Sequence, residues 1–158
     1  MTSQLLLGWS GLLGVIAGLI VSAAATEELK PAKRILRMTH DIIFLLAAGL
    51  FLHPAGYLAM AVGLLILTAA LATMPSRQAH QLTTLLFTVI LIITWDMPLF
   101  SAIAGLFLLS HMSAAGEWLA RNPEMVKKGC LSRTTLSAAA REFALTMTPP
   151  LALLPLII

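Results

Sequence analysis

Prolines divide the chain into apolar segments that are each about long enough to cross a lipid bilayer. A membrane-spanning helix needs about 20 residues, and the prolines recur at close to that interval. Proline is tolerated in the first turn of a helix and disfavours helical structure in the residue before it. The boundary prolines are Pro31, Pro54, Pro75, Pro98, Pro123 and the pair Pro149-Pro150. Their spacing predicts a series of helices joined by short connections.

Composition supports a membrane location for these helices. Of the 158 residues, 59% are hydrophobic and 11% are charged, and the mean hydropathy is +0.93. A soluble domain of this size exposes much of its surface to water and cannot bury so large an apolar fraction. A bilayer solvates apolar side chains directly. We therefore expect an all-α, polytopic integral membrane helix bundle that forms one domain over residues 1–158.

Six transmembrane helices are expected, at about residues 4–25, 33–52, 55–73, 78–95, 98–119 and 132–158. No Lys or Arg precedes the first apolar run, so we interpret it as a retained helix and not as a cleaved signal peptide. The last segment is less regular, because Pro149 and Pro150 remove two backbone donors within it. It also carries Arg133 and Arg141 along one face, as in a helix that lies at the membrane surface. Five crossings plus an interfacial C-terminal helix is therefore the alternative.

The basic residues that flank the predicted helices all fall in alternate connections. These residues are Lys30, Lys33, Arg34, Arg37, Arg77, Arg121, Lys127, Lys128 and Arg133. The turns at His53 and Asp96 contain none. Cytoplasmic connections are enriched in Lys and Arg, so the pattern predicts a cytoplasmic membrane, with the N-terminus and both turns outside. Because these flanking residues explain the net charge of +3, we expect no nucleic-acid binding.

Small residues recur every four positions in the first predicted helix, at Gly14, Gly18 and Ser22. Such a row lets a second helix approach closely, which is how helices associate when lipid offers no hydrophobic contrast. Packing within the bundle is the preferred interpretation. The alternative is a homo-oligomer, or a partner in a larger membrane complex, bound through this helix.

Ionisable residues gather at the predicted cytoplasmic ends of the helices. The candidates are His40, Asp41, His111, Glu117 and Arg141, with His80 and Glu142 expected nearby. Ionisable groups inside a membrane span are unfavourable and often mark a transport path. One hypothesis is a polar pocket, open to the cytoplasm, in which Asp41 or Glu117 pairs with Arg141 and a histidine exchanges a proton near neutral pH. The alternative is that most of them are boundary residues solvated by headgroups and water, although His111 lies too deep for this.

Three classes of function are compatible with this pattern. The favoured one is a transporter or channel for a proton, an ion or a small solute that uses the polar cluster. The second is an accessory or scaffold subunit of a membrane complex. The third is a membrane-embedded haem protein or enzyme.

The sequence offers little for the third class. No cofactor is predicted, although a haem b could be held by His40 and His111 if they face each other at one depth. Asp41 and Asp96 fall at opposite ends of the bundle, so they cannot form a catalytic pair. The single cysteine, Cys130, excludes an intramolecular disulfide and a multi-cysteine metal site. Enzymatic activity is therefore not favoured.

Overall fold

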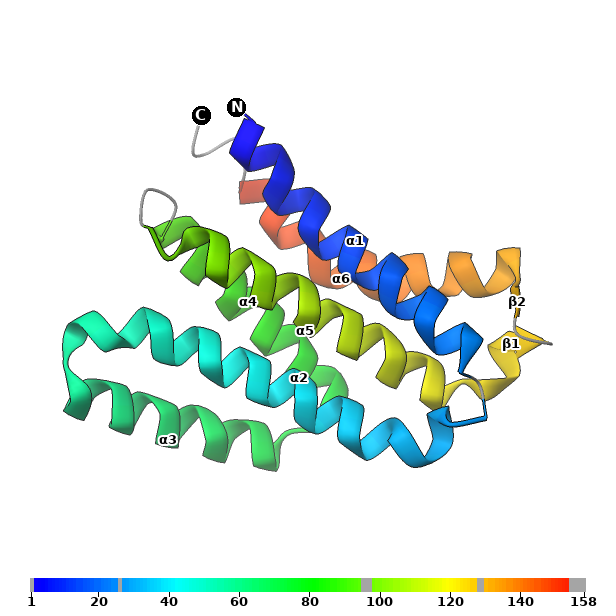
Figure 1. Cartoon of the computed structure of the whole chain (residues 1–158), viewed down its shortest axis with the longest axis horizontal. Helices are drawn as coiled ribbons and strands as arrows, with labels where there is room; N and C mark the ends of the chain where they lie inside the picture. Colours follow the sequence, from blue (N-terminus) through cyan, green and yellow to red (C-terminus); the bar gives the residue numbers. More distant parts are fainter. Residues whose placement is uncertain (1, 26, 95–97, 128–129, 154–158) are drawn as a thin grey trace.

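The computed structural model describes residues 2–25, 27–94, 98–127 and 130–153 as a bundle of six long helices (Figure 1). Asp96 and residues 154–158, which the sequence places in a turn and in the last helix, lie outside the described residues. The long helices are α1 (Thr2–Ala24), α2 (Leu29–Leu52), α3 (Tyr57–Thr73), α4 (Ser76–Ile93), α5 (Phe100–Arg121) and α6 (Arg133–Leu153). The all-helical prediction is confirmed at this level.

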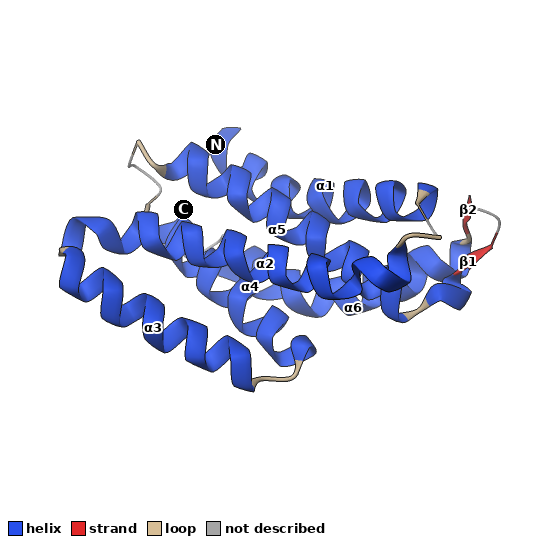
Figure 2. Ribbon diagram, turned by 60° about the horizontal axis from the view of Figure 1, so that its bottom comes forward, coloured by secondary structure: helices blue, strands red, loops and turns tan. Residues whose placement is uncertain are grey.

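Short elements complete the connections. A 3-10 turn, η1 (His53–Ala55), joins α2 to α3, and a second one, η2 (Pro123–Met125), follows α5. Two-residue strands, β1 (Val126–Lys127) and β2 (Cys130–Leu131), pair antiparallel before α6 (Figure 2). Gly56 has a φ of 101° between η1 and α3, a conformation that other residues rarely adopt.

Helix boundaries follow the prolines with small differences. α2 begins at Leu29, earlier than expected, because Pro31 fits in its first turn without losing a hydrogen bond. α6 continues through Pro149 and Pro150 to Leu153. The fixed φ of proline is compatible with a helix even though its nitrogen cannot donate.

Helix α5 lies at the centre of the bundle, with α1 packed along one side and α2 along the other (Figure 1). The small-residue row of α1 forms the first contact. A Cβ atom added to Gly14 would lie 2.4 Å from the Leu108 carbonyl oxygen, and one added to Gly18 would lie 2.3 Å from that of Met112. Ser22 continues the row against Gly116 of α5. The row thus brings two backbones together within the bundle.

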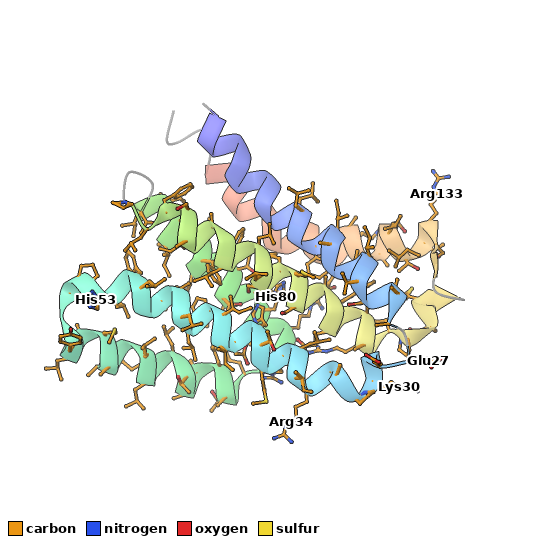
Figure 3. The ribbon with its side chains drawn as sticks, in the orientation of Figure 1. Glu27, Lys30, Arg34, His53, His80 and Arg133 are labelled. Carbon is orange, nitrogen blue, oxygen red and sulfur yellow. The ribbon has the colours of Figure 1, made fainter. Side chains whose placement is uncertain are left out.

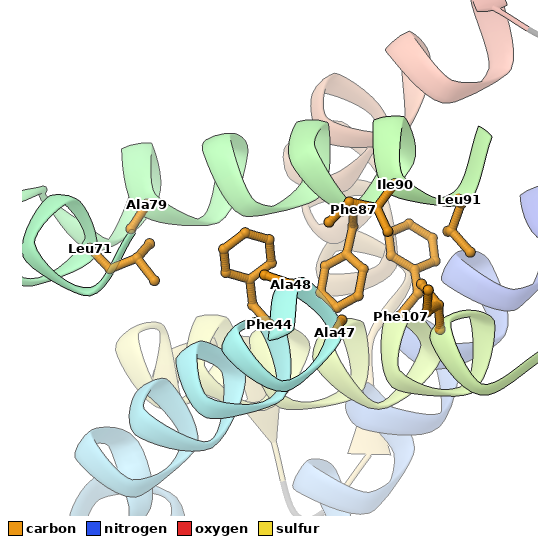
Figure 4. Close-up of a cluster of buried hydrophobic side chains, with 10 residues drawn as sticks. Phe44, Ala47, Ala48, Leu71, Ala79, Phe87, Ile90, Leu91 and Phe107 are labelled. Atoms are coloured by element: carbon orange, nitrogen blue, oxygen red, sulfur yellow. The ribbon is translucent and has the colours of Figure 1, made fainter. Parts of the chain in front are cut away.

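Three phenylalanine rings form the main apolar contact between α2, α4 and α5 (Figure 4). Phe87 lies between Phe44 and Phe107, with ring centroids 5.3 Å and 5.4 Å away respectively. All three side chains are buried. We call this contact the phenylalanine layer, because it fills the interior across three helices.

Helix α3 packs mainly on α2 and leaves its apolar side chains exposed. Leu71 is its one buried residue, whereas Leu58 is 80% exposed and Leu65 is 71% exposed. Within the described residues, two helices are long and apolar enough to cross a membrane, namely 30–55 and Phe100–Arg121. These observations support association with a membrane, because water would solvate such a surface poorly.

Several charged side chains lie at one end of the bundle. Glu27, Lys30 and Arg133 are found there, and His53 lies at the opposite end (Figure 3). We call these the charged end and the far end. Arg37 Nη2 donates to the Met74 carbonyl oxygen at 3.1 Å and so links α2 to the C-terminus of α3.

Candidate functional site

Three histidines from three helices meet inside the bundle. His40 comes from α2, His80 from α4 and His111 from α5. The His80 ring lies between the other two, with centroids 5.1 Å from His40 and 5.7 Å from His111 (Figure 3 shows its interior position). His40 is 4% exposed and His111 is fully buried. We call these residues the histidine cluster.

Asp41 orients the first member of the cluster. Its Oδ1 lies 3.2 Å from His40 Nδ1, and its Oδ2 lies 3.9 Å from Arg37 Nε. A carboxylate accepts hydrogen bonds, so His40 carries its proton on Nδ1 and leaves Nε2 as an acceptor in the neutral ring. His80 Nδ1 lies 3.2 Å from His40 Nε2 and donates to it. This assigns the tautomer of His80 and leaves its Nε2 without a proton.

His111 has the same tautomer as His40 and His80, and a backbone group of its own helix fixes this tautomer. Its Nδ1 donates to the Phe107 carbonyl oxygen at 3.0 Å, so its Nε2 is also an acceptor. The Nε2 atoms of His80 and His111 are both buried and have no hydrogen-bond partner within the described part of the chain. Buried polar atoms of this kind are normally satisfied by water or by a ligand. Two neighbouring neutral imidazoles therefore each present a bare nitrogen that can take up a proton.

A polar cavity of about 280 Å³ opens beside His80, between α4, α5 and α6. Two ion pairs lie in its wall. Arg77 Nε lies 3.1 Å from Glu142 Oε1 and joins α4 to α6, and Arg121 Nη2 donates to Glu117 Oε1 within α5. The cavity wall thus places two ion pairs next to His80, the central member of the histidine cluster.

The phenylalanine layer closes the other side of the cluster. Phe44 follows His40 by one helical turn, and Phe107 precedes His111 by one turn, with a ring centroid distance of 4.2 Å between these last two. Because both phenylalanines lie toward the far end, the cluster is separated from that end by an apolar barrier.

Four of the five polar residues chosen from the sequence lie in or beside this site. His40, Asp41 and His111 belong to the cluster or contact it, and Glu117 lines the cavity. Arg141 does not, because it is exposed and absent from the cavity wall. The expected pairing with Arg141 is therefore wrong: Glu117 pairs with Arg121, and Asp41 lies beside Arg37 and His40.

The sequence predicts that His80 and Glu142 lie near the polar cluster, but they are not among the site residues chosen from it. His80 proves to be the central member of the cluster, and Glu142 takes the place expected for Arg141. The signal that could have found His80 is a polar stripe on α4, where Arg77, His80 and Thr84 recur at helical spacing in an apolar segment.

The cluster does not fit a haem or a metal ion. A haem between His40 and His111 would have to displace the His80 ring, which contacts both. Within the described residues, no group of three or more His, Cys, Asp or Glu side chains has a geometry that could hold a metal ion. The arrangement is instead suited to accepting and passing protons.

Comparison of the chain with known protein families, with curated proteins and with solved structures found no match.

Proposed function

We propose that the chain is an integral membrane transporter that moves a proton, alone or together with a small solute, through the histidine cluster. In this proposal all six long helices cross the bilayer. The charged end faces the cytoplasm, and the N-terminus and His53 face the outside. The alternation of basic connections supports this orientation, and the exposed apolar side chains of α3 support contact with lipid.

The observation that carries the proposal is the pair of bare, buried Nε2 atoms on His80 and His111. An imidazole nitrogen without a proton can accept one, and ionisable groups within membrane spans commonly form proton relays. Here the hydrogen-bonded series Asp41, His40, His80 continues to His111 through a ring contact. The cavity beside His80 supports access of a proton or a solute to the cluster.

A flux assay tests the proposal directly. The purified protein is reconstituted into liposomes that contain a pH-sensitive dye, and collapse of an imposed pH gradient is followed. We expect His111→Leu to slow this collapse by about tenfold or more, because it removes a proton acceptor from the relay. The matched control is His53→Leu, since His53 lies at the far end, outside the cluster. Equal rates for His111→Leu and the unmodified protein would contradict the proposal.

Assembly through the first helix stays a prediction. The face of α1 that carries Gly14 and Gly18 is occupied by α5. A partner or second copy would instead contact the exposed side of α1, where Ile16 and Ile20 are 44% and 58% exposed. Within the part of α1 whose side chains the structure describes, no feature of that side distinguishes a protein partner from lipid, so we do not propose a scaffold function.

A further inference from the structure

We propose that the cavity beside His80 binds a small zwitterionic solute, with an ammonium group at one end and a carboxylate at the other. The inference rests on the proposed transport function, because it takes this cavity to be the binding site that opens onto the histidine cluster. It adds the chemical class of the solute, which follows from the charges, the unused donors and acceptors, the aromatic wall and the size of the cavity.

The cavity wall is balanced in charge. It contains two guanidinium groups, from Arg77 and Arg121, and two carboxylates, from Glu117 and Glu142, arranged as two pairs. A simple anion drawn to the arginines would also meet both carboxylates, and a simple cation would also meet both arginines. A solute with both charges can instead pair its carboxylate with a guanidinium and its ammonium group with a carboxylate.

Each ion pair leaves hydrogen-bonding capacity unused. The pairs engage Arg77 through Nε and Arg121 through Nη2, whereas a guanidinium has five N–H donors. Each carboxylate is engaged through Oε1, which leaves Oε2 as a further acceptor. The carboxylate of a solute can therefore bind the arginines in a bidentate manner, and its ammonium group can donate to a glutamate.

Aromatic rings line the same cavity. Trp118 and Phe143 contribute to the wall, with ring centroids 6.3 Å apart. Indole and phenyl faces attract ammonium and quaternary ammonium groups. Phe143 also contacts the His80 ring, at a centroid distance of 5.7 Å, so a solute held against it would lie next to the histidine cluster.

Size restricts the solute further. Pockets for drug-sized ligands have volumes of roughly 300–1,000 Å³, and this cavity, at about 280 Å³, lies just below that range. It would hold on the order of nine waters at about 30 Å³ each. We therefore expect a solute of the size of glycine or glycine betaine, not a lipid or a peptide.

Binding to the detergent-purified full chain tests the inference. Isothermal titration calorimetry is performed with glycine and glycine betaine, and with acetate and tetramethylammonium as analogues that carry one charge each. We expect at least one zwitterion to bind saturably, and at least tenfold more tightly than either single-charge analogue. Absence of saturable binding by both zwitterions would overturn the inference, as would equal or tighter binding of acetate or of tetramethylammonium.

Variants place the binding in the cavity. We expect Glu142→Gln and Arg121→Gln each to weaken zwitterion binding at least tenfold, while Arg133→Gln, an exposed residue away from the cavity, leaves it unchanged. Elution volume and thermal unfolding of each variant verify the fold. If both cavity variants fold and bind as well as the unmodified chain, the site is elsewhere and the inference is wrong.

The flux assay separates this inference from the proposed function. If no zwitterion binds but His111→Leu still slows proton flux, the inference alone is overturned. If a zwitterion binds in the cavity and His111→Leu leaves proton flux unchanged, the binding site is supported and the proton relay is contradicted.

Discussion

Asp41 determines the direction of the hydrogen bonds in the histidine cluster. Its carboxylate holds the proton of His40 on Nδ1, and this choice passes through His40 Nε2 to His80 Nδ1. The same carboxylate lies near Arg37, one turn earlier in α2. A single acidic side chain at the edge of the cluster thus decides which nitrogens face the interior as acceptors.

We therefore expect Asp41→Asn to slow proton flux by about tenfold or more. An asparagine amide can donate to His40 Nδ1 as well as accept from it, so the tautomer of the whole series is no longer determined. The measurement is the liposome pH-gradient assay. Glu28→Gln is the control, because Glu28 is exposed and precedes α2. A flux in Asp41→Asn as fast as that in this control would show that the tautomer does not matter.

At the residue scale, depth could be predicted from the sequence but orientation could not. Counting residues from the helix ends places His40, Asp41 and His111 in the same half of the bundle, and in the structure His40 and His111 both contact His80. Adjacent residues on a helix point about 100° apart, so the same count cannot choose between Arg141 and Glu142. That choice depends on how α6 is rotated against α4, which only the packed structure shows.

Among the contacts between helices, the one between α1 and α5 is the least tolerant of larger side chains. Gly14 and Gly18 bring the α1 backbone against carbonyl oxygens of α5, which cannot move aside as a flexible side chain would. The row of small residues was visible in the sequence, but its partner helix was not. A row of small residues on one helix indicates close packing, but it does not identify the helix that packs against it.

Alanine at Gly18 should therefore destabilise the bundle, although alanine is the better helix former. The added Cβ would meet the Met112 carbonyl oxygen at 2.3 Å and force the two helices apart. Overpacking of this kind lowers the free energy of unfolding by about 1–3 kcal/mol. Thermal unfolding in detergent, followed by circular dichroism, measures the change.

Gly105→Ala is the matched control for this substitution. It lies in α5, where an added Cβ would meet nothing within 4 Å. Its stability should stay the same or rise by about 0.5–1 kcal/mol, because alanine restricts the unfolded chain and favours helix. If both variants unfold at the same temperature, the close approach of α1 to α5 is not rigid.

For the whole molecule, the alternation of basic connections makes a prediction about threading. We propose that His53 and Glu124 lie on opposite sides of the membrane, since they belong to the turn at the far end and to the connection after α5. The composition and the proline spacing could predict a bundle of helices of about these lengths. The ionisable residues predicted a polar region at one end, but nothing in the sequence showed that aromatic rings from three helices close the interior beyond it.

Cysteine labelling tests this threading. In a Cys130→Ser background, a cysteine is introduced at His53 or at Glu124, and intact cells are treated with a membrane-impermeant maleimide. We expect labelling of the His53→Cys variant from the outside, and labelling of the Glu124→Cys variant only after the membrane is opened. Labelling of both variants in intact cells would contradict the proposed orientation.

Under the proposed transport function, the phenylalanine layer distinguishes a carrier from an open channel. Rings from α2, α4 and α5 fill the interior just beyond the histidines. A proton that arrives from the charged end therefore cannot continue past the phenylalanine layer. Release on the opposite side requires these helices to separate near the phenylalanine layer, and the route from the charged end to close. A transporter of this kind would carry one cargo per cycle at a rate that saturates, and it would not conduct a continuous current as an open channel does.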